Sequence, residues 1–417
     1  MKNFAALFPG QGSQFVGMYQ LLYEESSIVR DTIAEAEAVT GIRLKELCFC
    51  GSPSKLAKTE HAHIAIHAFS VAVFREFVES TGFIPKFCAG HSLGEYAALV
   101  CAGAIKFADA LKLVQLRSSL SKEIQKTCDG GMTIIDGIDI ETIAYACQKQ
   151  QAQGKQVYVS CYNSALQGAI SGTNKDLEDT ERLLLRSGKG TMAPLIGSAP
   201  FHSPLMETAV EPFRQQLKNI ETSEFRYPVL SNYTGRPYEN KEELENNLIN
   251  HLIRPVKWVN IMSYLAYRNI NLIIDFSANK VFQNMVAGNA PIETLCYGSR
   301  RERSTIQELF QGDLYLKHKS SFLSKCILAA ISTPNHNFDQ ESYQLNVVAN
   351  YRELIQLGDK VNNKEIKETI GVKSKGLELL IKILEGKKVS DQEKTRWLRQ
   401  IADETAATYE EFKFFSA

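Results

Sequence analysis

The chain has 417 residues, of which 44% are hydrophobic, and its 47 Lys and Arg balance its 47 Asp and Glu. A zero net charge argues against binding to nucleic acid or to a membrane surface, and no stretch approaches the ~18 apolar residues of a membrane span. The nine cysteines are scattered, and the single C-x-C pair of Cys48 and Cys50 has no partner pair at zinc spacing. We therefore expect reduced thiols, no metal site and a cytoplasmic location.

Strand and helix patterns alternate through the first third of the chain. The expected elements are strands at 4–8 and 83–88, and helices at 25–39, 63–78 and 107–124. This alternation predicts an α/β fold with a mostly parallel sheet.

The pattern changes after Gly130-Gly131. Expected strands at 132–137, 157–160, 167–172 and 192–196, with helices at 140–151 and 174–187, give the order β-α-β-β-α-β. That order is typical of a ferredoxin-like subdomain, here inserted into the larger α/β domain. Two further strands of the larger domain are expected at 229–232 and 271–276.

Helical patterns dominate from about residue 299 onward. They are expected at 320–330, 344–357, 364–370, 377–384 and 391–412, and their amphipathic spacing favours a docked appendage over a membrane-surface element. The expected division is a large catalytic domain at 1–128 and 203–299, a ferredoxin-like subdomain at 129–202 and a helical extension at 300–417.

The sequence Gly90-His91-Ser92-Leu93-Gly94 lies between an apolar strand and a helix rich in small residues. A Gly-x-Ser-x-Gly turn in that context exposes the serine at the end of the strand, in front of the first amides of the helix. Ser92 is therefore a candidate nucleophile; the alternative is a capping serine in an ordinary tight turn.

A serine nucleophile needs a base, and the chain has eight histidines. His202 lies in a loop between Pro200 and Pro204, whose fixed φ angles stiffen the loop, so it is the candidate base. The alternative is a loop histidine without a special role. His63 and His67 are four residues apart on one helix face, but no third metal ligand is placed near them, so packing or polar lining is the favoured interpretation.

Four separated motifs together resemble one enzyme family. They are Phe8-Pro9-Gly10-Gln11-Gly12-Ser13-Gln14, Gly90-His91-Ser92-Leu93-Gly94-Glu95-Tyr96-Ala97-Ala98-Leu99, Arg117 and Phe201-His202-Ser203. In order and spacing they are similar to the malonyl-CoA:acyl-carrier-protein transacylases along residues 1–300. The resemblance implies an α/β-hydrolase-like large domain and malonyltransferase activity.

The resemblance also implies a reaction. Ser92 would take a malonyl group from coenzyme A and pass it to the phosphopantetheine thiol of an acyl carrier protein. His202 would be the general base, oriented by backbone carbonyls rather than by an acid. The backbone amides of Gln11 and Leu93 would form the oxyanion hole. Malonyl-CoA is then a substrate, and no tightly bound cofactor is expected.

Further positions are carried over as substrate-binding residues. Arg117 resembles the arginine that binds the malonyl carboxylate, and the ring of Phe201 resembles the residue that disfavours an α-methyl branch. The same site would include His91, Asn163 and His251.

The chain departs from the family at several positions. His63 and His251 stand where many members have Gln, and Ser277-Ala278-Asn279 replaces Gly-Pro-Gly. Residues 335–352 of the tail are similar to free-standing acyltransferases that serve polyketide synthases, so synthase modules join the carrier protein as expected partners, in polyketide or fatty acid biosynthesis.

Three alternatives remain open from the sequence. One is an acyl hydrolase of the same fold that removes acyl chains from carrier proteins. Another is an inactive relative that only docks carrier protein or synthase. A generic α/β-hydrolase esterase fits poorly, because such enzymes carry an acid between serine and histidine, where this chain carries the ferredoxin-like insertion.

Overall fold

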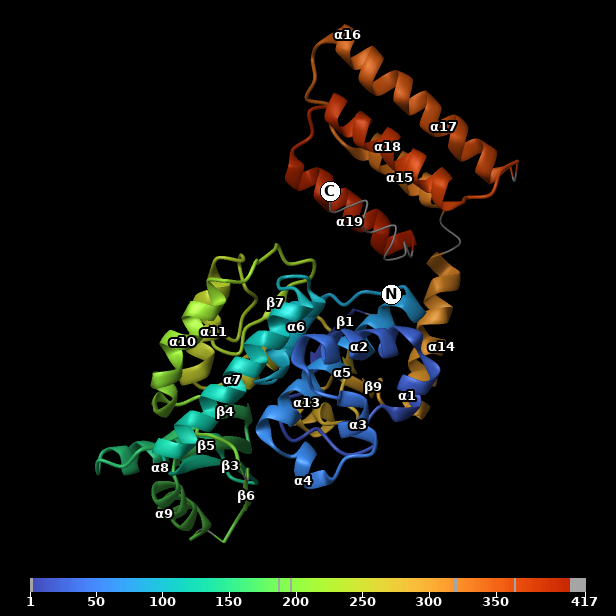
Figure 1. Cartoon of the computed structure of the whole chain (residues 1–417). Coiled ribbons are helices and arrows are strands. Elements are labelled where there is room, and N and C mark those ends of the chain that lie inside the picture. The colour runs from blue at the N-terminus through green and yellow to red at the C-terminus, as the bar shows by residue number, and fades with distance from the viewer. Residues whose placement is uncertain (1–2, 187, 196, 318–320, 364, 406–417) are drawn as a thin grey trace. The chain divides into compact units, whose positions relative to one another are not determined.

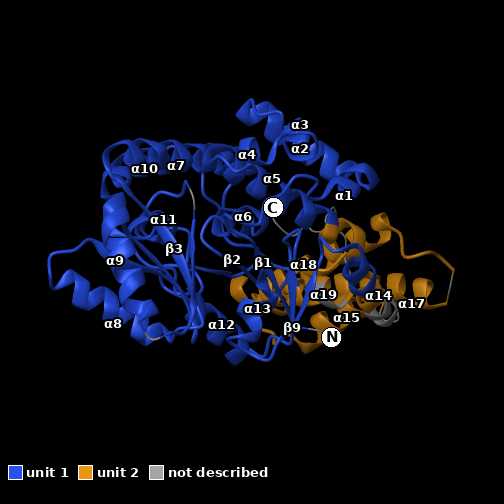
Figure 2. Cartoon of the chain, turned by 90° about the horizontal axis from the view of Figure 1, so that it is seen from below, with its two compact units in different colours: residues 1–76, 85–306 blue, residues 77–84, 307–417 orange. Residues whose placement is uncertain are grey.

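A computed structural model describes residues 3–186, 188–195, 197–317, 321–363 and 365–405. The chain divides into two compact units, residues 1–76 with 85–306 and residues 77–84 with 307–417 (Figure 2). The division falls within α5 (Thr59–Thr81) and within α14 (Arg300–Lys317).

The first unit contains a five-stranded sheet in which all paired neighbours are parallel, in the order β7-β2-β1-β8-β9. Its strands are β1 (Phe4–Phe8), β2 (Phe87–Gly90), β7 (Val229–Leu230), β8 (Leu272–Asp275) and β9 (Glu293–Cys296). Every residue of β1, β2 and β8 is buried, as expected for central parallel strands with both faces covered.

Helices make up much of the rest of this unit, and the larger part of α5 belongs to it. They are α1 (Gln20–Glu25), α2 (Ser27–Thr40), α3 (Leu44–Phe49), α4 (Pro53–Leu56), α5, α6 (Gly94–Cys101), α7 (Phe107–Thr127), the 3₁₀ helix η1 (Pro204–Ala209), α10 (Val210–Leu217), α11 (Glu243–Ile253), α12 (Trp258–Tyr267) and α13 (Phe282–Ala287). The α/β class predicted from the alternation is confirmed.

A second, antiparallel sheet of four strands lies in the same unit, in the order β4-β5-β3-β6. Its strands are β3 (Gly130–Asp136), β4 (Val157–Ser164), β5 (Gln167–Thr173) and β6 (Thr191–Pro194). The helices α8 (Ile140–Gln151) and α9 (Asn174–Leu185) pack against it around buried Ile135, Ile143 and Ile170 (Figure 1). The predicted β-α-β-β-α-β order is present.

The second unit is helical. It contains α15 (Phe322–Ser332), α16 (Gln340–Tyr343), a π-helical turn η2 (Gln344–Val348), α17 (Ala349–Asn362), α18 (Ile370–Gly386) and α19 (Asp391–Thr405). Leu323, Leu354, Leu380 and Ile383 are fully buried in its core.

Several expected elements differ from the structure. The helix expected at 25–39 is α2, which begins two residues later than expected because Ser26 is its N-cap and accepts a hydrogen bond from the Val29 amide. The preceding short helix α1 is an element that the sequence patterns do not predict. No helix forms at 365–369, residue 364 lies outside the described residues, and the strand expected at 229–232 ends at Leu230. The edge strand β9 was not predicted, because its partly exposed sequence lacks an apolar run.

Two expected elements extend beyond what the structure describes. Residue 196, at the end of an expected strand, and residues 406–412, at the end of an expected helix, lie outside the described residues. Within the described part of the chain, no helix combines the length and apolarity needed to cross a bilayer.

Candidate active site

The site lies at the carboxyl ends of the parallel strands. Gln11 follows β1, Ser92 follows β2 and Asn232 follows β7, and the three strands are adjacent in the sheet. Because parallel strands end at the same edge, residues far apart in the sequence converge there.

Ser92 occupies a sharp turn between β2 and α6, with a φ of 50°. Two glycines make this turn possible. A Cβ on Gly90 would lie 1.9 Å from the carbonyl carbon of Gly94, and a Cβ on Gly94 would lie 2.1 Å from the carbonyl oxygen of Phe8. The strained serine backbone is therefore held by close packing that only glycine permits.

Ser92 and His202 are hydrogen-bonded, with 2.7 Å between Oγ and Nε2, although they are 110 residues apart in the sequence. The Nδ1 of His202 lies 2.7 Å from the backbone carbonyl oxygen of His251, so Nδ1 carries the proton and donates. The neutral ring then accepts at Nε2 from the Ser92 hydroxyl. This arrangement can take a proton from the serine during attack on a carbonyl carbon.

His202 is held in the neutral state required of a base. Burial, and then the nearby Arg117 charge, lower the pKa of His202 to about 3, while the hydrogen bond to His251 acts in the opposite direction. Its backbone also has a positive φ of 60°. Both members of the dyad therefore sit in strained backbone conformations that the surrounding packing enforces.

Arg117 projects from α7 into the site. Its Nη2 donates to Ser92 Oγ at 3.3 Å, and its Cζ lies 4.0 Å from the centre of the Phe201 ring. The residue is 2% exposed, and among the described residues no ion pair involves it and its Nε has no hydrogen-bond partner. A buried cation without a counter-charge is costly, so this site is suited to an anionic ligand next to the serine.

The backbone amides of Leu93 and Gln11 are the expected oxyanion donors. Leu93 is the N-cap of α6, whose next three amides donate to the carbonyls of His91, Ser92 and Leu93 itself. In the described part of the chain, neither the Leu93 nor the Gln11 amide donates to another group. Both are thus available to a developing negative charge, with the positive end of α6 behind Leu93.

His63 holds the Gln11 loop. Its Nε2 lies 3.0 Å from the Gln11 side-chain oxygen and its Nδ1 2.8 Å from Ser118 Oγ. His67 instead packs on the ring of Phe107, with centroids 5.7 Å apart. The polar-lining and packing interpretations of these two histidines agree with this geometry, and the described residues contain no metal-binding group of three His, Cys, Asp or Glu.

His91 and Asn163 bind each other. The Nε2 of His91 donates to Asn163 Oδ1 at 2.8 Å, and Asn163 Nδ2 donates to Gln167 at 3.3 Å. This chain of bonds joins the serine turn to β4 and β5 of the antiparallel sheet. A substrate-binding role for the two residues stays a prediction.

Asn232, which is absent from the predicted site residues, secures the serine turn. Its side-chain amide donates to the Gly90 carbonyl at 2.7 Å and accepts from the Ser92 amide at 2.8 Å. The sequence does not single out Asn232, because an Asn after a short strand carries no chemical signal by itself.

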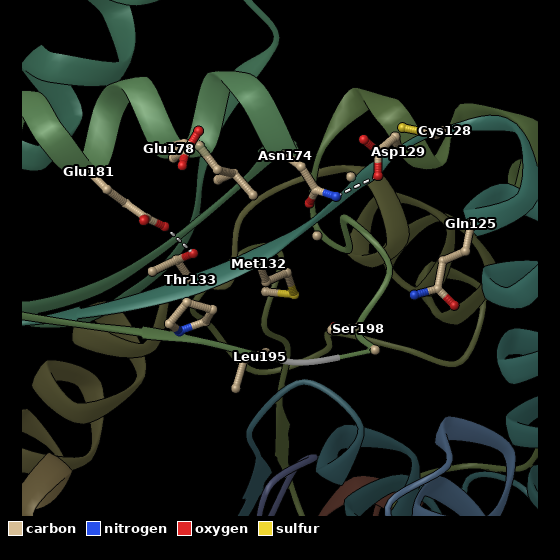
Figure 3. A pocket seen from close by; sticks show the side chains of 15 residues that line it. Gln125, Cys128, Asp129, Met132, Thr133, Asn174, Glu178, Glu181, Leu195 and Ser198 are labelled. Atoms are coloured by element: carbon tan, nitrogen blue, oxygen red, sulfur yellow. Dashed lines mark hydrogen bonds between the residues drawn. The ribbon is translucent and has the colours of Figure 1, made fainter.

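A separate pocket of about 390 Å³ opens beside β3 and α9 (Figure 3). It is lined by Gln125, Cys128, Asp129, Gly130, Gly131, Met132, Thr133, Asn174, Leu177, Glu178, Glu181, Pro194, Leu195, Gly197 and Ser198. Glu181 accepts from Thr133 and Asp129 accepts from Asn174, so these acids are already bonded. The lining does not include the serine–histidine dyad or the buried arginine.

Comparison with known proteins agrees with this geometry. The sequence profile of the acyl transferase domain family matches residues 6–287. A malonyl CoA-acyl carrier protein transacylase of Bacillus subtilis strain 168 is 35% identical over 286 residues, covering 69% of this chain and 90% of the relative. Another from Bacillus subtilis is 29% identical over 401 residues, covering 96% of this chain and 100% of the relative.

Solved structures of the same kind superpose on this chain. A malonyl-transacylase in complex with a type II polyketide synthase acyl-carrier protein gives a TM-score of 0.71 at 32% identity, covering 74% of this chain and all of that one. FabD from Acinetobacter baumannii gives 0.70 at 30% identity, with 74% and 98% covered. The chain therefore belongs to the acyl transferase domain family and, within it, to the malonyl CoA-acyl carrier protein transacylases.

Proposed function

We propose that this chain moves a malonyl group from coenzyme A, through an ester on Ser92, to the phosphopantetheine thiol of an acyl carrier protein in fatty acid or polyketide biosynthesis. The observation that carries the substrate assignment is the buried, unpaired guanidinium of Arg117, 3.3 Å from Ser92 Oγ. A malonyl thioester carries a free carboxylate two bonds from the carbonyl carbon that a nucleophile attacks, and this guanidinium can bind it.

In the first half-reaction His202 Nε2 takes the proton of Ser92 as Oγ attacks the thioester carbonyl carbon. The oxyanion of the tetrahedral intermediate is bound by the amides of Leu93 and Gln11, each such donor being worth ~3 kcal/mol. The carbon–sulfur bond then breaks, and the His202 imidazolium returns its proton to the coenzyme A thiolate.

The second half-reaction runs the same steps in reverse with a different thiol. The phosphopantetheine thiol of the carrier protein gives its proton to His202 and attacks the Ser92 ester. Collapse of the intermediate releases the malonyl thioester, and Ser92 regains its proton. The carbonyl of His251 supports the imidazolium in both halves by accepting from its Nδ1 proton.

Arg117 separates this proposal from a hydrolase of the same fold. A hydrolase for neutral acyl chains gains nothing from a buried cation beside its nucleophile. A docking protein without activity would not need an assembled dyad with two strained residues.

We further propose that residues 1–128 and 203–299 form the catalytic domain, 129–202 the ferredoxin-like subdomain and 300–417 an appended helical domain. All nine cysteines are free thiols, which supports a reducing compartment, and we propose the cytoplasm. We propose no resident cofactor, because the dyad, the amides and Arg117 supply each group that acyl transfer needs.

Intact-mass spectrometry after incubation with malonyl-CoA tests the assignment. A malonyl adduct on the wild type that is absent in Ser92→Ala, and that is lost on adding phosphopantetheinylated carrier protein with gain of malonyl-carrier protein, is the expected result. Release of free malonate at the same rate with and without carrier protein would favour the hydrolase instead.

A further inference from the structure

A buried carboxyl group lies behind the histidine that binds the base. The ring of His251 packs on the ring of His202 with centroids 4.9 Å apart and planes 28° apart. His251 Nδ1 also lies 3.5 Å from Glu95 Oε2. Glu95 is fully buried and His251 is 1% exposed, so the contacts that link Ser92 through His202 and His251 to Glu95 are closed to solvent beyond the serine.

Glu95 is anchored by groups that also hold the nucleophile. The Tyr238 hydroxyl donates to Oε1 at 2.6 Å, and the backbone amide of Asn232 donates to Oε2 at 3.2 Å. The side chain of Asn232 in turn binds the backbone of Gly90 and Ser92. One carboxyl group therefore connects the base and the serine turn, and the acyl transfer steps above give it no role.

The contacts of Glu95 and His251 allow one proton to be placed on either group. Within the described residues, neither ring nitrogen of His251 has a hydrogen-bond partner, and Glu95 Oε2 is the carboxylate oxygen that lies 3.5 Å from Nδ1. If Glu95 is ionised, His251 carries its proton on Nδ1, and this N–H can move closer and donate to the carboxylate. If Glu95 is protonated, the carboxyl group can donate to an unprotonated Nδ1. In both cases a single proton lies between the two groups.

Burial favours the uncharged pair. Burial raises the pKa of Glu95 to about 8, although hydrogen bonds from Tyr238, Asn232 and Ser231 act to lower it. Burial also lowers the pKa of His251. The other titratable or charged groups acting on the pair are His202, Arg117, His91, Tyr96 and Tyr238. Arg117, His202 and His91 disfavour a positive charge on His251. Glu95 is therefore the member of the pair that gains or loses a proton.

We propose that Glu95 and His251 are a positioning pair for His202, in which the carboxyl group fixes the His251 ring against His202 and its charge sets the proton affinity of the base. The proposal rests on the proposed function, since it concerns the same dyad. When Glu95 loses its proton, a buried negative charge appears behind His251 and favours the His202 imidazolium that forms during serine attack. The rate of Ser92 acylation should therefore rise as the pH passes about 8.

The experiment measures single-turnover acylation by malonyl-CoA from pH 6 to 10 in the full chain. Glu95→Gln keeps the size of the side chain and cannot titrate, and His251→Gln keeps the backbone carbonyl that binds His202. Glu141→Gln on α8, exposed and outside the site, is the matched control. Both Glu95→Gln and His251→Gln should abolish or flatten the rise near pH 8.

Glu95→Gln and His251→Gln should also lower kcat about tenfold and leave the KM for malonyl-CoA unchanged. This loss is smaller than the 10²–10⁴-fold loss expected when general-base catalysis itself is removed. Profiles that superpose on the wild type in both variants would overturn the proposal. A wild type that forms no Ser92 adduct would instead overturn the proposed function, so the two failures are distinguishable.

A second variant keeps the test valid if Glu95→Gln does not fold. Tyr238→Phe removes one donor to the carboxylate and so raises the pKa of Glu95 further. The transition in the acylation profile should then move to higher pH. A transition that stays where the wild type has it rules out Glu95 as its source.

Discussion

The guanidinium of Arg117 donates a hydrogen bond to Ser92 Oγ at 3.3 Å, so the group assigned to the substrate carboxylate touches the nucleophile itself. In the free protein this hydrogen bond stabilises the serine oxygen, and the positive charge of Arg117 lowers the pKa of His202. A bound carboxylate would draw the guanidinium away from that double role. We therefore expect substrate recognition and the strength of the base to be coupled through Arg117.

Arg117→Ala should reduce kcat/KM for malonyl-CoA by about two to four orders of magnitude, because breaking such a buried charge pair costs ~3–5 kcal/mol. Acetyl-CoA, which lacks the carboxylate, should lose far less or gain. Rates for both thioesters, with the exposed Arg182→Ala on α9 as control, check this. An equal loss for the two substrates would show that Arg117 serves only the serine.

Malonyl binding should strengthen the base. The charge of Arg117 is the second cause, after burial, that lowers the pKa of His202 to about 3. Pairing Arg117 with the malonyl carboxylate offsets that charge, so the pKa of His202 rises in the complex.

The pH dependence of acylation measures this coupling, because kcat/KM reports the free enzyme and the saturated rate reports the complex. With malonyl-CoA, the acid limb of the saturated rate should lie at higher pH than that of kcat/KM. With acetyl-CoA the two limbs should coincide, and the same separation for both thioesters would contradict the coupling.

Phe201→Ala should relax the exclusion of methylmalonyl-CoA. We expect discrimination against the α-methyl group to fall by ~1–3 kcal/mol, the usual value of one methyl group in a pocket. Because the Phe201 ring also supports the guanidinium at 4.0 Å, malonyl transfer itself should slow. The test is a competition between malonyl-CoA and methylmalonyl-CoA, with the two Ser92 adducts quantified by mass spectrometry. A ratio of the two adducts equal to that of the wild type would place the Phe201 ring outside the specificity pocket.

Acid should destabilise the fold through its buried neutral histidines. Burial lowers the pKa of His67 and of His202 to about 3, below the 6.5 of an exposed histidine. The unfolded chain therefore binds more protons, so this stability is present above pH 6.5 and is lost as the pH falls toward 3. At pH 5 each of the two costs roughly 2 kcal/mol.

Denaturant titrations at pH 7.5 and pH 5 measure that loss. His67→Phe should reduce the difference between the two conditions, because an apolar ring in the same place takes up no proton. An unchanged difference would assign the acid sensitivity to other groups.

Gly90→Ala should abolish folding or activity, since its Cβ would lie 1.9 Å from a backbone carbon of Gly94. Gly371→Ala, in α18 with open space around its Cβ, should be neutral or stabilising by up to about 1 kcal/mol. Thermal melting of both variants, with the Ser92 adduct as readout, tests the turn. A folded and active Gly90→Ala would mean that the turn has another geometry.

The local units of the fold can be predicted from the amino-acid sequence alone. The serine turn, the β-α-β-β-α-β order and the first parallel strands follow from apolar periodicity and glycine placement, because these depend on neighbours within a few residues. The proline-flanked loop points to His202 as the candidate base, whereas the carboxylate-binding role of Arg117 is predicted only through the family resemblance.

The remaining groups around the dyad are brought to it by long-range contacts that form only in the folded chain. The group that orients the His202 ring by accepting a hydrogen bond is the backbone carbonyl of His251. Any residue at that position could supply a backbone carbonyl, so the residue type gives no indication of this role. Glu95 and Asn232 act through contacts across 137 to 142 residues that arise only when parallel strands end at one edge. The partly exposed edge strand β9 cannot be predicted in this way, because its residues show no alternation of polar and apolar side chains that distinguishes it from a loop.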